Sequence, residues 1–242
     1  MAMTSDQIQR VARQRIETEH LFGQPFLPPP DRAPTGSISS TSEALSAATG
    51  EPLEPLEEVE SRFRSVFPLG AGLAEATQPV FGEGNPVADL MFVGEAPGAD
   101  EDRLGRPFVG AAGKKLDEII NAMGFLRSDV YIANILKARP PDNRAPLPDE
   151  VADHGPFLKA QIRAIQPRVI VALGRPSAHF LLSSKDSMSR LRGVWGYWDD
   201  EGLRIPVMPT YHPAYVLRRY TQEVRAQVWS DMQQVMAKLQ ET

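Results

Sequence analysis

Four short apolar segments, each bounded by turn-forming residues, restrict the fold of this chain more than any other feature of its sequence. They span residues 89–93, 130–136, 168–173 and 205–210. Continuous apolar runs of this length are typical of strands buried on both faces, as in a parallel sheet covered by helices. The sequence therefore predicts a central, mostly parallel four-stranded sheet.

In the segments between and after these strands, apolar side chains recur at the spacing of an α-helix. In residues 113–123, apolar side chains recur at i, i+3, i+4 and i+7 from Leu116 onward, and Gly124 follows as a stop signal. Residues 148–165 and 222–239 are also predicted to be helical. Alternation of strands and helices is the α/β signature, so we expect a three-layer α/β/α sandwich.

The first 55 residues differ in composition from the rest. Three consecutive prolines at 28–30 lead into a stretch rich in Ser, Thr and Ala, which lacks the apolar area needed to offset the entropy of ordering. We expect residues 1–55 to form an arm that is partly disordered or loosely helical. The ordered domain is predicted to cover residues 56–242, and the arm is expected to be dispensable for chemistry.

Composition excludes several classes of protein. The 242 residues contain no cysteine, which excludes disulfides, thiolate nucleophiles, iron–sulfur clusters and Cys-based zinc sites. A reducing cytoplasm is the compartment that this composition favours. No segment approaches the roughly 20 apolar residues of a membrane helix, so no membrane partner is expected. The net charge of −5 argues against a generally basic coat but leaves room for one basic face.

The loop after the first strand contains Gly94, Glu95, Ala96, Pro97 and Gly98. Its glycines permit a tight turn in which backbone N–H groups approach a flat ligand closely, and Glu95 is directed into the cleft. An ordinary solvated carboxylate is the alternative for Glu95. The loop alone favours this alternative, and Glu95 is kept as a candidate because ligands of parallel sheets bind beyond the carboxyl ends of the strands.

Phe108 follows in the Gly-rich loop 105–110, where it is either a stacking platform for a base or a plug of the core. Gly110 to Lys114 then resemble a phosphate-binding loop, but the spacing fails. A Walker loop requires Gly at the position of Phe108 and Ser or Thr at that of Lys115. The spacing therefore argues against an ATPase, although the N-terminus of the helix that follows is still suited to a DNA phosphate.

Asn134 is a polar amide at the apolar end of the second strand. Its carboxamide both donates and accepts, which suits the edge of a pyrimidine, and a structural cap between two loops is the alternative. Lys137 and Arg139 lie in the loop that follows and are predicted to contact DNA phosphates, unless this loop is merely solvated.

His212 is the one histidine of four that follows a predicted strand. It is expected to face the cleft opposite Glu95, and no metal site can be assembled from its neighbours in sequence. Side chains near it are predicted to enter or flank a DNA groove as a wedge with phosphate clamps. These are Arg192, Tyr215, Leu217, Arg218 and Arg219.

In their order along the chain, these motifs resemble the family-four uracil-DNA glycosylases. The resemblance covers most of residues 63–238. It rests on Val-Phe-Gly-Glu-Gly-Asn-Pro at 80–86, Val-Gly-Glu-Ala-Pro-Gly at 93–98, Gly-Arg-Pro-Phe-Val-Gly at 105–110, Asn134, Lys-Ala-Arg-Pro-Pro at 137–141, Val-Ala-Leu-Gly at 171–174, Leu-Arg-Gly at 191–193 and Thr-Tyr-His-Pro-Ala-Tyr at 210–215.

The resemblance implies an enzyme that flips uracil out of DNA and cleaves its N-glycosidic bond. It implies that Glu95 and His212 lie in the two catalytic motifs, that Phe108 stacks on the base and that Asn134 reads its edge. The implied partner is uracil-containing DNA and the implied product is free uracil. A monomer without a cofactor is expected. Two alternatives remain, a non-catalytic nucleic-acid-binding relative and a small-molecule nucleotide hydrolase.

This chain departs from the family at one feature. The resemblance implies an iron–sulfur cluster held by cysteines at four positions, which map here onto Arg64, Phe67, Ala138 and His154. A cluster is therefore not expected. A related subgroup that crosslinks to its product carries an extra His after the second strand, and the corresponding residues 139–144 contain none, so covalent capture is not expected.

Overall fold

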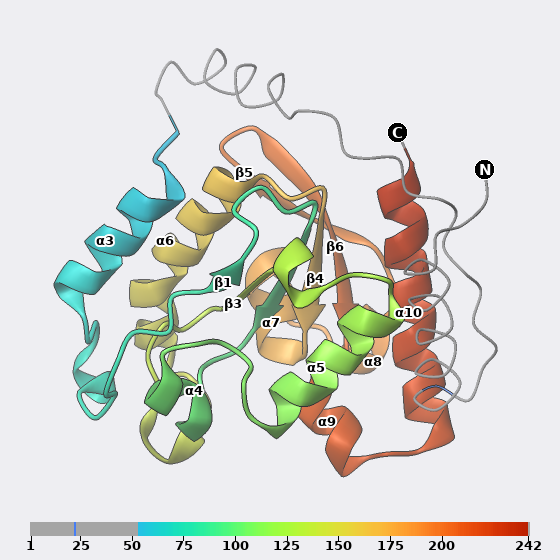
Figure 1. The fold of residues 1–242 in the computed structure, drawn as a ribbon, viewed down its shortest axis with the longest axis horizontal. Helices are drawn as coiled ribbons and strands as arrows, with labels where there is room; N and C mark the ends of the chain where they lie inside the picture. Colours follow the sequence, from blue (N-terminus) through green and yellow to red (C-terminus); the bar gives the residue numbers. More distant parts are fainter. Residues whose placement is uncertain (1–21, 23–52, 242) are drawn as a thin grey trace, which may run out of the picture.

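The structure is a computed structural model and describes Phe22 and residues 53–241 (Figure 1). Its centre is a six-stranded sheet with the order β1-β3-β2-β4-β6-β5. The strands are β1 (Glu83–Gly84), β2 (Leu90–Gly94), β3 (Tyr131–Asn134), β4 (Val169–Leu173), β5 (Gly196–Asp200) and β6 (Leu203–Thr210).

The four predicted strands correspond to β3, β2, β4 and β6, which are adjacent and parallel. The prediction of four strands is corrected to six, because an antiparallel strand is added at each edge. β1 has only 2 residues, too few to show an alternation of apolar and polar side chains. β5 has the sequence Gly-Tyr-Trp-Asp-Asp, which ends in two charged residues. Charged residues on an edge strand are typical, since they discourage pairing with other chains, but they hide the strand from an apolar pattern.

Helices cover both faces of the sheet (Figure 1). They are α3 (Leu56–Val66), α4 (Ala99–Leu104), α5 (Ala111–Ala122), α6 (Pro148–Ile165), α7 (Arg175–Leu182), α8 (Met188–Leu191), α9 (Pro213–Arg218) and α10 (Gln222–Gln240). In the described part of the chain, short 3₁₀ turns lie at Ala71–Leu73, Arg127–Asp129 and Pro141–Asn143.

The two faces of each central strand point into different apolar layers. Phe92 packs with residues of α5 and α10, whereas Met91 packs with residues of α6 and α7. α3 lies outside α6, and Phe63 and Phe157 belong to a third, aromatic cluster between these helices. The predicted three-layer α/β/α sandwich and its predicted helices are thus confirmed.

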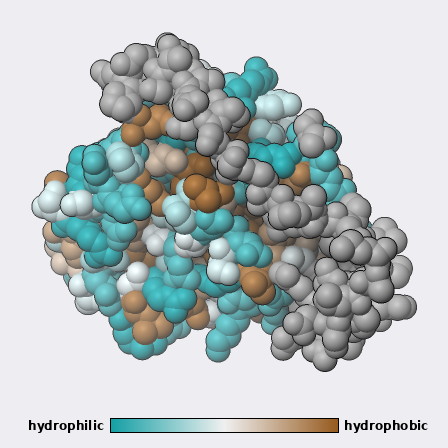
Figure 2. Space-filling model, turned by 45° about the horizontal axis from the view of Figure 1, so that its top comes forward, coloured by the Kyte–Doolittle hydropathy of each residue, from teal (hydrophilic) through white to brown (hydrophobic). Residues whose placement is uncertain are grey.

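The surface is mixed in character. Figure 2 shows a largely hydrophilic face on which hydrophobic residues form small separate patches. Within the described part of the chain, no helix combines the length and the hydropathy that a membrane span requires.

Most of the predicted arm lies outside the described residues, but Phe22 is placed. Its ring stacks on that of Trp229 in α10, with centroids 4.7 Å apart and an interplanar angle of 20°. Both side chains are buried in the layer that α5 and α10 form on the sheet. This part of the arm therefore supplies a core side chain, which its composition did not indicate.

Replacement of Phe22 by Ala is expected to lower the free energy of unfolding by about 3 kcal/mol, the usual cost of emptying a buried Phe site. Urea unfolding followed by circular dichroism measures this. Val87→Ala is the control, because Val87 is 58% exposed and its truncation should change stability by less than about 0.5 kcal/mol. Equal stabilities of the two variants would show that the Phe22 contact does not form in solution.

Candidate active site

The carboxyl ends of the four parallel strands meet at one edge of the sheet, and the candidate site is built from the residues there. Gly94 ends β2 and is paired in register with Asn134, which ends β3. Glu95 directly follows β2, and His212 lies two residues beyond the end of β6. The prediction that Glu95 and His212 follow strands ending at one edge is confirmed.

Gly94 allows two side chains to converge. A Cβ atom at this position would lie closer than 3.0 Å to Oδ1 of Asn134 and to Cζ of Phe108. The ring of Phe108 also lies beside the imidazole of His212, with centroids 5.6 Å apart and planes tilted by 33°. The structure thus brings together four of the predicted residues, from four separate segments.

Phe108 has an uncommon backbone conformation, with a φ of +50°. This left-handed conformation costs a residue with a Cβ about 1 to 2 kcal/mol, so its neighbours must hold it. Gly113 is one of them, because any Cβ there would collide with the carbonyl group of Phe108. The ring is 5% exposed and packs in the core. Phe108 is therefore a core side chain that also faces His212.

Glu101 joins the two loops of the site, and our sequence reasoning missed it. Its Oε1 accepts hydrogen bonds from the N–H groups of Val109 (2.8 Å) and Gly110 (2.9 Å). Its Oε2 accepts one from the N–H of Gly98 at 3.1 Å, which ties the Gly94–Gly98 loop to the Phe108 loop. A Glu three residues after Gly98 has the spacing of a capping box, which was the available signal.

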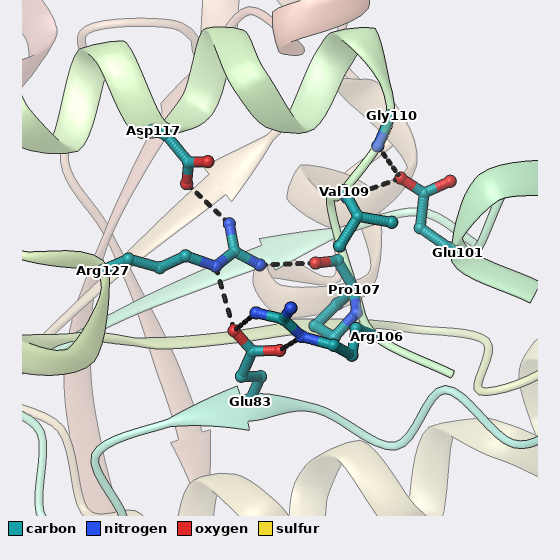
Figure 3. A network of polar contacts seen from close by, with 8 residues as sticks. All are labelled: Glu83, Glu101, Arg106, Pro107, Val109, Gly110, Asp117 and Arg127. Carbon is teal, nitrogen blue, oxygen red and sulfur yellow. Dashed lines mark hydrogen bonds and ion pairs between the residues drawn. The ribbon is translucent and has the colours of Figure 1, made fainter. Parts of the chain in front are cut away.

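A second polar network holds the other side of the Phe108 loop (Figure 3). Arg127 donates to the carbonyl oxygen of Pro107 at 2.5 Å and to Asp117 at 2.7 Å. Glu83 binds Arg127 and also accepts two hydrogen bonds from Arg106, at 2.5 and 2.8 Å. Hydrogen bonds to the backbone thus hold the segment on both sides of Phe108, which explains how its conformation is maintained.

Asn134 is 2% exposed. Its Oδ1 is buried and has no hydrogen-bond partner within Phe22 and residues 53–241. A buried carbonyl oxygen without a partner costs about 1 to 3 kcal/mol, so such atoms call for an explanation. A structural cap would leave this oxygen bonded. The free oxygen therefore favours the ligand-reading interpretation of Asn134 over the cap.

Glu95 is half-buried, and Ala96 beside it packs against the apolar layer under α6 and α7. Burial raises the pKa of Glu95 above its ordinary value, and the positive charge of Arg175 partly opposes this shift. Arg175 begins α7, after β4, at the same edge of the sheet. Sequence reasoning did not connect Arg175 with Glu95, because no local pattern links the two.

His212 is the N-cap of α9. Its Nδ1 accepts a hydrogen bond from the N–H of Ala214 at 3.1 Å, so this nitrogen carries no proton. The pKa of His212 is lowered to about 4, mainly by burial and also by the positive charge of Arg218, while the charge of Glu101 acts in the opposite direction. The imidazole is therefore neutral at pH 7 and its proton is on Nε2.

Asp231 fixes the end of β6 just before His212. This buried carboxylate accepts hydrogen bonds from Thr210 Oγ1 (2.7 Å) and from Arg192 (2.6 Å). Arg192 was predicted to clamp a DNA phosphate. That prediction is corrected, because its guanidinium is engaged by Asp231 and by the carbonyl oxygen of Gln227.

The predicted DNA contact of Lys137 is wrong. Its side chain is completely buried, and its Nζ donates to the carbonyl oxygen of Asn134 at 2.7 Å and to Gln161. Burial holds its pKa well below the ordinary value. A group enclosed in this way does not reach a phosphate.

The remaining predicted DNA contacts lie at the surface or near it. Leu217 is 40% exposed, and Arg218 and Arg219 next to it are also exposed. Tyr215 is half-buried against Tyr211, with ring centroids 4.7 Å apart. Half-buried Arg139 donates to Asn143 at 2.8 Å. Leu217, Arg218 and Arg219 belong to the segment that begins at His212 and forms α9.

Comparison with known proteins identifies the family. A family model described as the uracil DNA glycosylase superfamily matches residues 81–233. The chain belongs to this superfamily. The type-4 uracil-DNA glycosylase of Archaeoglobus fulgidus is 46% identical over 163 residues, which is 66% of this chain and 81% of that protein.

Other members of the superfamily are also similar in sequence to this chain. The type-4 uracil-DNA glycosylase of Thermotoga maritima is 47% identical over 158 residues, 65% of this chain and 81% of that protein. The type-5 uracil-DNA glycosylase of Thermus thermophilus is 33% identical over 121 residues, which is 44% of this chain and 55% of that protein. The resemblance to family-four uracil-DNA glycosylases is therefore confirmed.

The side chains at the four positions that resemble cluster ligands do not fit an iron–sulfur cluster. Arg64 is exposed and pairs with Glu60, and Phe67 packs edge-on against Phe63. Ala138 offers only a methyl group, and both ring nitrogens of His154 are engaged by backbone groups. Among the described residues, no three His, Asp or Glu side chains form a group suited to a metal ion.

Proposed function

We propose that this protein removes uracil from DNA. It flips the uracil nucleotide out of the helix and hydrolyses the N-glycosidic bond, which leaves an abasic site and free uracil. One observation carries the proposal. The buried Oδ1 of Asn134, unpaired in the described chain, lies close to Phe108 across Gly94. The identity with type-4 uracil-DNA glycosylases supports the same conclusion.

Asn134 and Phe108 bind the base in this proposal. Oδ1 of Asn134 accepts the N3–H of uracil, which supplies the partner that this oxygen otherwise lacks. The ring of Phe108 stacks on the flipped base, and its fixed backbone keeps the ring in place before the base arrives. Leu217, Arg218 and Arg219 contact the DNA around the flipped nucleotide.

His212 and Glu95 act on the charges that develop during bond cleavage. Uracil leaves as an anion, and the Nε2–H of neutral His212 stabilises the negative charge at O2 by a hydrogen bond. The deoxyribose becomes cationic, and the carboxylate of Glu95 opposes this charge and orients the water that attacks C1′. Neither role requires His212 to be charged.

A strand-cleavage assay tests the proposal. Purified protein is incubated with an oligonucleotide that contains one uracil, and alkali then breaks the strand at abasic sites. Cleavage of the uracil strand, but not of the matching thymine strand, is expected. Protein that binds the uracil strand tightly and yields no abasic site would instead identify a non-catalytic binding protein. Hydrolysis of free nucleotides alone would identify a small-molecule hydrolase.

The pH profile of the reaction follows from the two shifted groups. Since the pKa of His212 is lowered to about 4, the single-turnover rate should show no inflection near the ordinary histidine value of about 6.5. The rate should fall in acid as Glu95 gains a proton, at a pH above its ordinary 4.5 because burial raises its pKa. Glu95→Gln should remove this acid limb. An inflection near pH 6.5 that disappears in His212→Asn would contradict the neutral assignment.

Asn134→Asp is expected to weaken uracil recognition by about 10- to 100-fold and to favour cytosine, since a buried mismatched hydrogen bond costs about 1 to 3 kcal/mol. The carboxylate accepts from the N4–H₂ of cytosine but repels O4 of uracil. The measured quantity is the ratio of kcat/KM values for uracil and cytosine strands. Asn143→Asp is the control, because Asn143 is exposed in the Pro141–Asn143 turn. An unchanged ratio in Asn134→Asp would remove Asn134 from base recognition.

We also propose that the protein is a monomer that works in the cytoplasm. A sheet edge that carries all the proposed catalytic groups needs no second subunit, and a chain without cysteine suits a reducing compartment. Light scattering coupled to size-exclusion chromatography measures the oligomeric state.

A further inference from the structure

His154 connects three segments that are far apart in the sequence. It belongs to α6 and is completely buried. Its Nδ1 accepts a hydrogen bond from the backbone N–H of Lys137 at 3.0 Å. Its Nε2 therefore carries the ring proton and donates it to the carbonyl oxygen of Leu69 at 2.9 Å. One neutral imidazole thus binds the chain after α3 and the chain after β3.

These are the segments that a cluster would join in the resembling family. Leu69 lies two residues beyond Phe67, Lys137 precedes Ala138, and His154 itself occupies the fourth position. The ring of Phe63 lies beside the imidazole, with centroids 5.5 Å apart, and Phe67 packs edge-on against Phe63. The replacement of cysteines thus coincides with a new connection between the same parts of the chain.

The connection reaches the candidate site through Lys137. Its buried Nζ donates to the carbonyl oxygen of Asn134 and to Gln161. Gln161, also on α6, donates to the carbonyl oxygen of Phe81, and the carbonyl oxygen of Lys137 accepts from Val80. The backbone from Asn134 to Lys137 is therefore held by several hydrogen bonds, and His154 supplies one of the two backbone hydrogen bonds at Lys137.

We propose that His154 is a positioning residue for Asn134, which it holds in place through Lys137. The proposal rests on the proposed function for the role of Asn134, and on the structure alone for the connection. Loss of His154 leaves the buried N–H of Lys137 and the part-buried carbonyl oxygen of Leu69 without these hydrogen bonds. The segment 134–137 then relaxes, and Asn134 loses its alignment with the base.

Three variants separate the two hydrogen bonds of His154. Asn has its Oδ1 near the place of the imidazole Nδ1, so His154→Asn keeps the acceptor for Lys137. His154→Gln extends an amide donor toward Leu69, and His154→Leu fills the volume and provides neither. His179→Leu is the matched control, because His179 is a half-buried histidine of α7 whose Nε2 pairs with the carbonyl oxygen of Asp186.

The main readouts are hydrogen exchange of the peptide that contains Lys137 and the kinetics on a uracil-containing strand. In His154→Leu we expect exchange at Lys137 to accelerate at least about tenfold, because its N–H loses its acceptor. KM should rise about tenfold, since base binding requires an aligned Asn134, while kcat changes less. His154→Asn should recover most of both, and His179→Leu should change neither.

Two further results decide difficult cases. If His154→Leu does not fold, His154→Asn and His154→Gln still test the proposal, because protection of Lys137 should follow the acceptor and not the donor. Parent-like exchange in every folded His154 variant, or parent-like KM despite faster exchange, overturns the proposal. If the parent protein fails to excise uracil, the proposed function fails, and hydrogen exchange still tests the connection.

Nitrogen-15 chemical shifts of His154 should show the Nε2–H form, and the opposite tautomer would also overturn the proposal.

Discussion

His212→Ala is expected to slow uracil excision in a single turnover by about 100- to 1,000-fold, the usual cost of losing one donor to a developing anion. Binding of uracil-containing DNA should stay close to that of the parent, because the hydrogen bond from Nε2 strengthens only as charge builds on the leaving base. Rapid-quench rates at saturating enzyme measure the chemical step, and fluorescence anisotropy measures binding.

The Ala variant also removes the N-cap of α9, which His212 provides through Nδ1. His212→Asn separates the two losses. Asn is a good N-cap, so this variant keeps the helix start but has no donor at the position of Nε2. It should be nearly as slow as His212→Ala. His179→Ala, at a half-buried histidine that pairs with the carbonyl oxygen of Asp186, should keep the parent rate. Recovery of the rate in His212→Asn would show that the cap matters and the donor does not.

Gly94→Ala is expected to reduce kcat/KM by about 100-fold or more. The added methyl group would lie closer than 3.0 Å to Oδ1 of Asn134 and to Cζ of Phe108, so both must move. Displacement of reacting or binding groups by about 1 Å costs roughly this much. Both the affinity for uracil DNA and the chemical rate should fall, which distinguishes this variant from His212→Ala.

Gly202→Ala is the matched control for this change. Gly202 lies in the turn between β5 and β6, and a Cβ there meets nothing within 4 Å. Its φ of +83° makes Ala strained, so the control loses stability without touching the site. If Gly94→Ala retained activity within about threefold of Gly202→Ala, the convergence of Phe108 and Asn134 on Gly94 would not be needed for the reaction.

The sequence carried enough information to place the strands and the residues that follow them. Buried parallel strands are short apolar runs, and the geometry of such sheets directs attention to their carboxyl ends. Glu95, Asn134 and His212 were found in this way. Their protonation and pairing were not, because the pKa of His212 depends on burial and on Arg218 and Glu101, which only the fold brings near.

The errors share one physical cause. Lys137 and Arg192 were treated as surface charges because their neighbours in sequence look like loops. In the structure, each is satisfied by a partner distant in sequence, Gln161 for Lys137 and Asp231 for Arg192. Hydrogen bonds between side chains that are far apart in sequence leave no pattern in the sequence around either residue. Glu101 was missed although its partner Gly98 is close, because the carboxylate bonds only to backbone groups.

The link through His154 consists of an imidazole and two backbone groups. A cluster held by thiolates must be assembled from iron and sulfide, and its ligands can be oxidised stepwise by peroxide. An imidazole that bridges a backbone N–H and a backbone C=O needs no metal ion and contains no thiolate. In the proposed arrangement, the position of Asn134 therefore depends neither on a supply of iron nor on the redox state of a thiolate ligand.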